Sequence, residues 1–492
     1  MSLASWIHKW AQSDRVAFQF EGQATTYAEL ADRIDAVGSA LVHAGAGPGD
    51  RVGYCGLNRI ELFEMLFASA SIGAILVPFN NRLTASELAA QIEDSDPTLL
   101  FSTDGFDELL SQAAPGRSVH DLDREPLTRA GGDRLAGHGG DNPPRQATVL
   151  MVYTSGTTGQ AKGAMLSHDA ILHTVLNSID HQGLTQNDRI VAPLPTFHVG
   201  GLNIQTLPTL YVGGQVLLQR RFDPGGVLDL IATHRATQTL LVPAMLQAVA
   251  AHANFADTDL ASLTGINSGS SVVPTEVMQP FFDRNVPVGQ VYGTTETGPT
   301  AVVLDYADAQ THAGSCGRPA RHTDLRIVDQ RGNDVIDGMA GELWLRGANI
   351  FTGYWNNAQA TDEAFAPGGW FRTGDVGYRD PTGYVFISDR IKDVVISGGE
   401  NIYPAEIEGV LARHPAISEV AVVGRFDERW GEIPIAVLVL NADSELTIDA
   451  LRDWCEGQLA RFKQPRALRI VEELPRTALG KVKKHELRLS QS

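Results

Sequence analysis

Residues 26–54 read TYAELADRIDAVGSALVHAGAGPGDRVGY and contain one complete helix-to-strand unit. Thr26 and Glu29 have the spacing of a capping box, in which a hydroxyl and a carboxylate satisfy free amides at a helix start. The apolar residues that follow recur at helical spacing and share one face: Leu30, Ile34, Val37 and Leu41. The glycine-rich stretch 45–50 ends this helix, and residues 51–54 predict a short strand.

The same alternation of helices and short apolar strands continues down the first third of the chain. A second helical pattern of apolar residues lies between residues 62 and 67, and the apolar run 74–77 ends at Pro78. Thr84 and Glu87 form another capping box. Helices that alternate with short apolar strands predict an α/β fold with largely parallel sheets.

Two changes of character divide the rest of the chain. From about residue 315, strand-like runs such as 324–328 and 341–346 are punctuated by Gly, Asp and Asn, which predicts a small β-rich unit. After Arg390 a further α/β module is predicted, with helices at 404–411 and 448–459 and strands at 420–423 and 435–440. We therefore predict an N-terminal domain over residues 1–390 and a C-terminal domain over residues 391–492.

The composition excludes several classes of protein. The 492 residues include 39 Lys+Arg and 58 Asp+Glu, a formal net charge of −19, whereas a general nucleic-acid binder carries a basic surface, so we expect no nucleic-acid partner. Cys55, Cys316 and Cys455 form no CxxC pair, which favours buried thiols in a reducing compartment. The amino terminus lacks the apolar segment of a signal peptide, and no apolar run reaches the roughly 18 residues of a membrane span. We expect a cytoplasmic protein with no integral membrane segment, and leave open whether it forms a homodimer.

A loop rich in glycine and hydroxyl residues follows the apolar strand predicted at 147–153. Residues 154–163 read TSGTTGQAKG. Glycines let backbone N–H groups approach an anion, hydroxyls donate to phosphate oxygens, and the lysine adds positive charge. The loop is not a Walker A motif, because that motif needs glycine at 161 and Ser or Thr at 163, where the chain has Ala161 and Gly163. From these residues alone, a phosphate loop and an ordinary polar turn are about equally supported.

The loop closely resembles the phosphate loop of the adenylate-forming (AMP-binding) enzymes, the superfamily of acyl-CoA synthetases, aryl-acid ligases, adenylation domains and luciferases. Further segments resemble that family's motifs in the family's order: LPTFHVGG (194–201), VYGTTE (291–296), WFRTGD (370–375), DRIKD (389–393), ISGGEN (396–401) and PRTALGK (475–481). The resemblance covers essentially the whole chain. It implies a large N-terminal domain of two α/β subdomains plus a small β-rich unit, and a small mobile C-terminal α+β domain.

The resemblance also implies a role for particular residues. The implied catalytic residues are Lys481, Glu296, Thr295, His198 and Lys162, and the implied metal ligands are Glu296 and Thr154. The implied nucleotide and CoA contacts are Thr154, Ser155, Gly156, Thr157, Thr158, Gly159, Gly269, Ser270, Ser271, Tyr292, Gly293, Thr294, Asp375, Arg390, Lys392, Gly398 and Gly399. In this scheme Tyr292 lies against adenine, Asp375 accepts from the ribose hydroxyls, Lys392 is the hinge and Lys481 serves adenylation. The implied cofactors are ATP, Mg²⁺ and coenzyme A.

The implied reaction is AMP-forming ligation of a small carboxylic acid to CoA through an acyl-adenylate. The candidate acid-pocket segments 199–203, 242–245 and 297–301 are apolar or small and carry no charge. Because burial of an unpaired second carboxylate is costly, we expect a hydrophobic monocarboxylic acid. We rank a medium- or long-chain fatty acid first and an aryl or hydroxycinnamate-type acid close behind, with a diacid less favoured. Residues 267–274 depart from the family pattern, which leaves the identity of the acid open.

Three rival functions remain at this stage. A stand-alone adenylation enzyme would load a carrier protein instead of CoA, although the GGENIYP run at 398–404 looks more like that of the CoA ligases. A luciferase-like oxygenase would need a luciferin. A catalytically silent nucleotide or acyl sensor is the alternative from another class, and the joint presence of Lys162, Glu296, Asp375 and Lys481 argues against it.

Overall fold

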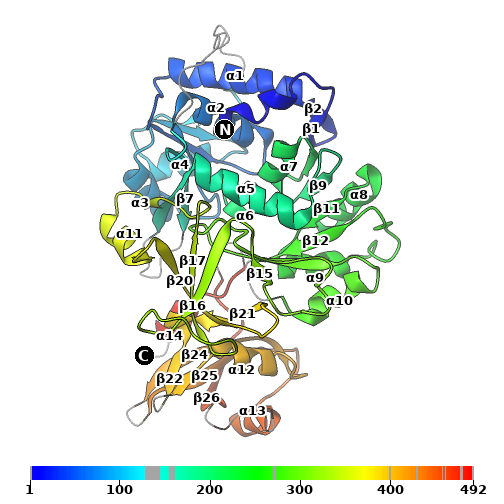
Figure 1. Cartoon of the computed structure of the whole chain (residues 1–492), viewed down its shortest axis with the longest axis vertical. Helices are drawn as coiled ribbons and strands as arrows, with labels where there is room; N and C mark the ends of the chain where they lie inside the picture. The colour runs from blue at the N-terminus through cyan, green and yellow to red at the C-terminus, as the bar shows by residue number, and fades with distance from the viewer. Residues whose placement is uncertain are drawn as a thin grey trace. The chain divides into compact units, whose positions relative to one another are not determined.

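Two compact units make up the chain in the computed structural model (Figure 1). The structure describes residues 3–127, 144–154, 161–269, 273–397, 400–427, 430–456, 458–459, 461, 463–476 and 480–489. The first unit comprises Met1–Leu325 and Leu345–Phe371, and the second comprises Arg326–Trp344 and Arg372–Ser492. The domain boundary predicted at residue 390 lies within the second unit, and it stays a prediction.

A seven-stranded sheet forms one half of the first unit. Five neighbouring strands (β7, β4, β3, β5 and β6) run parallel, and β8 and β18 are added antiparallel at one edge. In sheet order the strands are β18 (Gly353–Tyr354), β8 (Lys162–Ser167), β7 (Thr148–Thr154), β4 (Ile75–Pro78), β3 (Arg51–Cys55), β5 (Leu99–Ser102) and β6 (His120–Asp121).

A nine-stranded sheet forms the other half of the first unit. Its six central strands, from β13 to β1, are parallel, whereas β14, β15 and β2 are antiparallel to their neighbours. In sheet order the strands are β15 (Arg318–Pro319), β14 (Val302–Leu304), β13 (Val288–Tyr292), β12 (Gly265–Ser268), β11 (Gln238–Leu240), β9 (Arg189–Ala192), β10 (Gln215–Leu218), β1 (Val16–Phe20) and β2 (Gln23–Thr26). The two sheets confirm the predicted α/β class.

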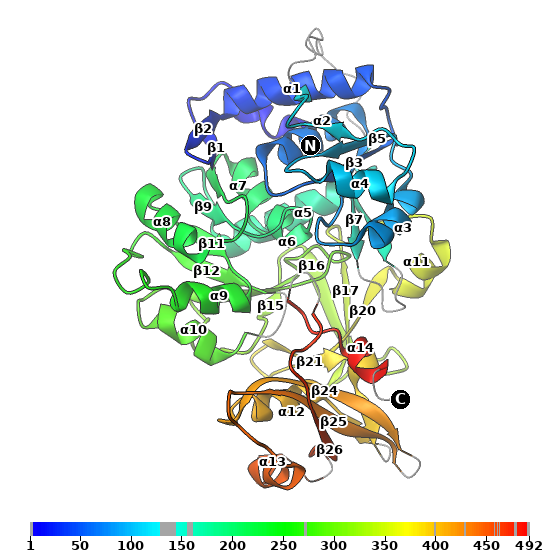
Figure 2. The ribbon, with the colours of Figure 1, turned by 180° about the vertical axis from the view of Figure 1, so that it is seen from behind.

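Helices cover both sheets of the first unit. They are α1 (Tyr27–His43), α2 (Ile60–Ile72), α3 (Ala85–Ser95), α4 (Asp107–Ala113), α5 (His168–Gln182), α6 (Val199–Asn203), α7 (Thr206–Val212), α8 (Pro224–His234), α9 (Pro243–Ala250), α10 (Thr275–Phe282) and α11 (Ala358–Ala364). Both predicted capping boxes are present, at Thr26 and Thr84, and the four residues of the predicted α1 face are buried. Helix α5 runs across the middle of this unit (Figures 1 and 2), packed on β8 of one sheet and on α7, which covers the other.

The predicted β-rich segment is a sheet through which the chain passes from one unit to the other. Its strands are β16 (Thr323–Val328), β17 (Gly341–Gly347), β20 (Trp370–Arg379) and β19 (Phe365–Ala366), with β21 (Val385–Arg390) paired to β20. The unit boundaries fall within β16, β17 and β20. The strands predicted at 324–328 and 341–346 are therefore confirmed.

The rest of the second unit is an α+β module with its own buried core. Its strands in sheet order are β23 (Glu400–Ile402), β22 (Val395–Ser397), β25 (Gly431–Leu440) and β24 (Ile417–Asp427), with β26 (Ala467–Ile470) paired to β25; its helices are α12 (Pro404–Leu411), α13 (Ile448–Cys455) and α14 (Lys484–Leu489). The α12 bounds match the prediction. The prediction of a helix at 448–459 was wrong about where the helix ends. Helix α13 stops at Cys455, because Glu456, its C-cap residue, adopts an extended conformation.

Two exclusions made from the sequence can be compared with the described residues. Among the helices of the described ranges, none is long and apolar enough to cross a membrane. All three cysteines are buried free thiols, as expected.

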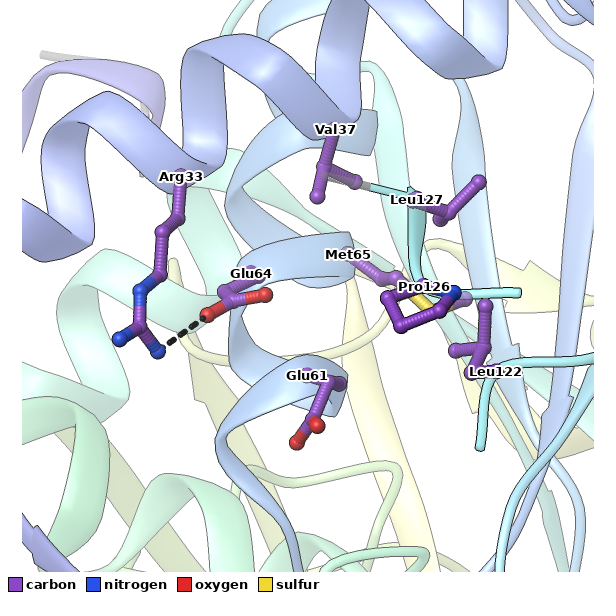
Figure 3. A pocket seen from close by; sticks show the side chains of 8 residues that line it. All are labelled: Arg33, Val37, Glu61, Glu64, Met65, Leu122, Pro126 and Leu127. Atoms are coloured by element: carbon purple, nitrogen blue, oxygen red, sulfur yellow. Dashed lines mark ion pairs between the residues drawn. The ribbon is translucent and has the colours of Figure 1, made fainter. Parts of the chain in front are cut away.

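A carboxylate is buried beside a cavity of about 90 Å³ between α1 and α2 (Figure 3). Glu64 is 3% exposed, and Nη1 of Arg33, on α1, lies 3.5 Å from its Oε1. Burial, reinforced by the nearby charge of Glu61, raises the pKa of Glu64 from 4.5 to about 7, although Arg33 opposes the shift. The folded protein therefore binds the Glu64 proton more tightly than the unfolded chain does.

This burial predicts a pH-dependent stability. Because the folded-state pKa is raised, the contribution of Glu64 is fully present below pH 4.5 and is lost as pH rises through about 7. The loss approaches about 3 kcal/mol above that range. We expect Glu64→Gln to resemble the parent at pH 5 and to gain stability relative to it by pH 8, measured by urea denaturation. Glu363→Gln, at an exposed position on α11, is the control. Parallel pH profiles for parent and Glu64→Gln would contradict the prediction.

Candidate active site

The predicted phosphate loop joins two antiparallel strands. Thr154, at the end of β7, is paired in register with Lys162, at the start of β8. The predicted contacts Ser155, Gly156, Thr157, Thr158 and Gly159 lie outside the described residues. The hairpin nevertheless places the Thr154 hydroxyl and the Lys162 side chain at the two ends of the predicted loop.

A single carboxylate, Glu296, lies beside this hairpin. Its Oε1 accepts a hydrogen bond from the Tyr354 hydroxyl at 2.9 Å and lies 3.5 Å from Oγ1 of Thr154. Its backbone oxygen accepts from the N–H of Phe351 at 2.8 Å. Glu296 is only 8% exposed, so these contacts hold its carboxylate in one position.

Sequence reasoning missed Tyr354. This residue lies in β18, the strand that pairs with β8 through Gly353↔Met165 and Tyr354↔Ala164. The Lys162 Nζ lies 5.2 Å from the centroid of the Tyr354 ring, within range of a cation–π interaction. Tyr354 thus contacts both the predicted metal ligand and the predicted loop lysine. Its local signal, an aromatic pair at 354–355 after a glycine, says nothing of a strand partner so distant in the chain.

The turn after β13 carries Tyr292, predicted to lie against adenine, and Thr295, one of the predicted catalytic residues. Tyr292 ends β13, and Thr295 is buried. The Thr297 hydroxyl accepts from the N–H of Thr294 at 2.8 Å, and the Asn349 amide donates to the carbonyl of Thr297 at 2.5 Å. Within the described ranges, the buried Thr294 hydroxyl has no hydrogen-bond partner. Hydrogen bonds through Thr297 therefore hold this turn in place.

Val242 and Met245, from one of the three predicted acid-pocket segments, follow β11 at the sheet edge formed by the carboxyl ends of the parallel strands. This is the edge where ligands bind to open α/β sheets. An apolar cluster lies there, made of Leu194, Ile204, Leu240 and Val291 with Val242, Met245 and Val303 packed on it. The expectation of a hydrophobic acid stays a prediction.

His198 follows β9 at the same edge of the sheet. Burial lowers the pKa of His198 to about 4. The imidazole is therefore neutral near pH 7, and His198 can serve as a hydrogen-bonding or contact group but not as a cation.

The segment after β12 forms a tight contact with β13. A Cβ at Gly269 would lie 2.7 Å from the carbonyl oxygen of Val291, so only glycine fits. Ser270 and Ser271 lie outside the described residues. The departure from the family pattern therefore begins directly beside the apolar cluster, because Val291 belongs to it.

Glu296 and Thr154 fit the metal predicted for them. Both offer oxygen atoms, which Mg²⁺ prefers, and Mg²⁺ is commonly held by one or two carboxylates together with substrate phosphates. The described part of the chain contains no cluster of three or more His, Cys, Asp or Glu residues that could hold a metal. Two oxygen ligands from the protein thus suit a Mg²⁺ ion whose remaining ligands come mainly from the phosphates of a nucleotide.

The remaining predicted residues lie in the second unit. Asp375 is 4% exposed on β20, and its backbone is paired in register with that of Arg390 on β21. Lys392 is exposed in the short helix η4 (Ile391–Asp393). Gly398 and Gly399 lie outside the described residues.

Lys481 is exposed in a turn near the carboxyl end of the second unit. Arg476 and Val482 form an isolated bridge beside it, and the Arg476 guanidinium donates to the carbonyl of Gly480 at 2.6 Å. Gly480 has φ +81°, which favours glycine at this position. The predicted residues are thus divided between the units: Thr154, Lys162, His198, Gly269 and Tyr292–Glu296 belong to the first, and Asp375, Arg390, Lys392 and Lys481 belong to the second.

Two family models match most of the chain. The model of the AMP-binding enzyme matches residues 7–355, and the model of the AMP-binding enzyme C-terminal domain matches residues 406–481. Together they contain the phosphate loop, Glu296 and, at the end of the second match, Lys481.

Curated relatives align over nearly their whole length. An indoleacetate–CoA ligase of Aromatoleum aromaticum is 42% identical over 99% of this chain and 98% of its own. A feruloyl-CoA synthase of Amycolatopsis sp is 38% identical with the same coverage. A long-chain-fatty-acid–CoA ligase of Mycobacterium tuberculosis is 34% identical over 94% of this chain and 92% of its own.

The fold is similar to solved structures. The o-succinylbenzoate CoA synthetase of Bacillus subtilis, in complex with its acyl-adenylate intermediate, has a TM-score of 0.89 and 30% identity over 98% of this chain and 97% of that one. The same enzyme in complex with ATP and a magnesium ion has a TM-score of 0.88 and 30% identity. That match covers 98% of this chain and 99% of that one.

Proposed function

Because this chain belongs to the AMP-binding enzyme family, we propose that it is an ATP-dependent ligase that joins an aryl-substituted monocarboxylic acid to coenzyme A. The observation that carries the ligase chemistry is the cluster of Glu296, Thr154, Tyr354 and Lys162 around the phosphate hairpin. The observation that supports a hydrophobic acid is the lack of charged residues in the candidate acid-pocket segments 199–203, 242–245 and 297–301.

In the first step the acid carboxylate attacks the α-phosphate of ATP and displaces pyrophosphate. The reacting groups are all anionic, so the main task of the protein is to position them and to offset their repulsion. Lys162 and Lys481 supply positive charge, and Thr294 and Thr295 provide hydroxyls at the turn after β13. Glu296 and Thr154 would hold Mg²⁺, which when bound neutralises phosphate charge. Tyr354 keeps the Glu296 carboxylate in place through its 2.9 Å hydrogen bond.

In the second step the thiol of coenzyme A attacks the acyl carbonyl and AMP leaves. A thioester forms and the mixed anhydride bond to AMP breaks. We propose that Lys481 serves only the first step, and that Gly398 and Gly399 line the path of the pantetheine arm in the second. Glycine suits such a path because a side chain would narrow it.

We now rank an aryl acid above a fatty acid, which reverses the order expected from the sequence. Two relatives support this change, since those at 42% and 38% identity are named for indoleacetate and ferulate, while the relative named for long-chain fatty acids is 34% identical. The fatty acid stays the second candidate, because candidate pocket segments without charged residues suit both acids. A diacid ranks last, since the candidate acid-pocket segments 199–203, 242–245 and 297–301 contain no Arg or Lys that would pair with a second carboxylate.

A pyrophosphate-release screen tests the proposal. The acids are indole-3-acetate, ferulate, octanoate, palmitate and malonate, each with and without CoA. We expect an aryl acid to give a kcat/KM at least about tenfold above the fatty acids, as differences in apolar contact in a pocket allow. We expect AMP to be released in multiple turnovers only when CoA is present. A fatty acid in first place would contradict the acid class, and no release with any acid would contradict the ligase function.

A further inference from the structure

A chain of hydrogen bonds in the first unit joins the end of α5 to β12, Tyr306 and β11. His181, the second-last residue of α5, lies with Nε2 3.0 Å from Oδ1 of Asn267 on β12. The Asn267 amide donates to the hydroxyl of Tyr306 at 2.7 Å, and that hydroxyl donates to Oε1 of Gln238 at 3.0 Å. The Gln238 amide donates to the carbonyl oxygen of Gln182 at 2.8 Å. We name these five residues the His181 relay.

The direction of every bond in the relay follows from its last member. The Gln182 atom is a backbone carbonyl oxygen, which can only accept, so the amide nitrogen of Gln238 must face it. Oε1 of Gln238 then accepts from Tyr306, whose oxygen accepts from the amide nitrogen of Asn267. Oδ1 of Asn267 is therefore the atom that faces His181, and Nε2 of His181 must carry a proton.

The other ring nitrogen of His181 also faces an acceptor. Nδ1 lies 3.0 Å from Oδ1 of Asp305, and this hydrogen bond lowers the pKa of Asp305, which keeps the carboxylate ionised. A carboxylate can only accept, so Nδ1 carries a proton as well. The His181 side chain is 1% exposed, so water does not offer alternative partners. The bonding pattern requires the imidazolium form.

The fold makes room for the relay. A Cβ at Gly265 of β12 would lie 2.5 Å from the Tyr306 ring, and a Cβ at Gly289 of β13 would lie 3.0 Å from it. Glycines on two adjacent strands thus allow this ring to pack against the sheet. Burial also raises the pKa of Tyr306, so its hydroxyl stays protonated and can donate.

The relay acts on the strand end that leads to the candidate acid pocket. The carbonyl oxygen of Asn267 accepts from the N–H of Leu241 at 3.0 Å, between Leu240 and Val242 of the apolar cluster. Two residues later, Gly269 packs on the carbonyl of Val291, another member of that cluster. The side chain of Asn267 thus belongs to the His181 relay, and its backbone is bonded to the chain after β11, between two members of the cluster.

From this arrangement we infer that His181, held as an imidazolium between Asp305 and Asn267, is a positioning residue that fixes the end of β12 against the acid-binding cluster. The inference rests on the proposed function insofar as that cluster binds the acid. His181 acts through the proton on Nε2, which orients Asn267, and it does not touch the substrate.

Histidine-selective ¹⁵N labelling tests the protonation state without any assay of activity. Two-bond ¹H–¹⁵N correlations distinguish the imidazolium from either neutral tautomer, and His181→Gln identifies the His181 signals by their loss. We expect the imidazolium pattern for His181 at pH 7.5. In Tyr306→Phe the Asn267 amide is free to turn and donate to Nε2, so we expect a neutral imidazole. A neutral His181 in the parent protein, or an unchanged pattern in Tyr306→Phe, would overturn the inference.

Kinetics test the positioning role with a matched pair of variants. Tyr306→Phe is expected to raise the KM for the acid about tenfold, as loss of a buried polar partner implies, with the KM for ATP within about twofold. In Asp305→Asn the new side-chain amide can donate to Nδ1 of His181. Nε2 then keeps its proton and its hydrogen bond to Oδ1 of Asn267, so the KM for the acid should stay within about twofold. An unchanged KM in Tyr306→Phe, or an equal rise in Asp305→Asn, would overturn the inference.

The two hypotheses fail separately. The KM is measured with whichever acid of the screen turns over, so a fatty acid in place of an aryl acid leaves the relay test intact. If no acid turns over, the ligase proposal fails, while the NMR comparison still decides whether His181 is held as the relay requires.

Discussion

Lys481→Ala is expected to slow acyl-adenylate formation by about 10²–10³-fold, the effect typical of removing one preorganised charge-stabilising group. The ammonium offsets repulsion between the carboxylate and the ATP phosphates, and an alanine cannot. Conversion of a supplied acyl-adenylate to the CoA thioester should change little, because pyrophosphate has already left. Acid-dependent ATP–pyrophosphate exchange measures the first step, and single-turnover thioester formation from the synthetic adenylate measures the second.

The neighbouring lysine is a matched control for this variant. Lys483 lies two residues away, with its Nζ 2.9 Å from Oε1 of Glu486. Lys483→Ala removes one charge from the same region and should leave both steps near the parent rates. The contacts beside Lys481 come from Arg476, Gly480 and Val482, so Lys481→Ala should keep the local backbone. Equal loss of both steps in Lys481→Ala would contradict the proposed role.

Glu296→Gln is expected to lower adenylate formation about 10²-fold at a fixed, low Mg²⁺ concentration, comparable to loss of a single charge-stabilising group. Glutamine has the same shape and keeps a carbonyl oxygen that can accept from the Tyr354 hydroxyl, as Oε1 of Glu296 does at 2.9 Å. The variant therefore removes the negative charge while it preserves the local hydrogen bond. Mg²⁺ ligation by a neutral amide is weaker than by a carboxylate, so higher Mg²⁺ should restore part of the rate.

Titration of Mg²⁺ in the pyrophosphate-release assay checks this expectation. The midpoint of the Mg²⁺ dependence should move to higher concentration in Glu296→Gln and stay in place in Glu276→Gln, which changes an exposed carboxylate in the first turn of α10. A rate loss that does not depend on Mg²⁺ would assign Glu296 a structural role in its turn instead.

Much of the local structure was predictable from short stretches of sequence. The capping boxes at Thr26 and Thr84 depend on residues three positions apart, and both are present. The bounds of α12 matched because its first turn begins with a proline and its apolar residues share one face. Where a boundary depended on more distant neighbours the prediction was less accurate: β24 runs from Ile417 to Asp427, longer than predicted, because it pairs along nearly its whole length with β25.

From the amino-acid sequence by itself we predicted the α/β class, which the two sheets confirm, because helix and strand spacing are local properties. The phosphate loop and the choice of Glu296 and Thr154 as metal ligands came from short motifs that resemble those of a known family, and they stay predictions. Only the tertiary structure brought Tyr354 to Glu296 and His181 to Asn267. These pairs are 58 and 86 residues apart in the chain. Strand pairing and helix packing decide such contacts, because a hydrogen bond depends on positions in space that local periodicity does not specify.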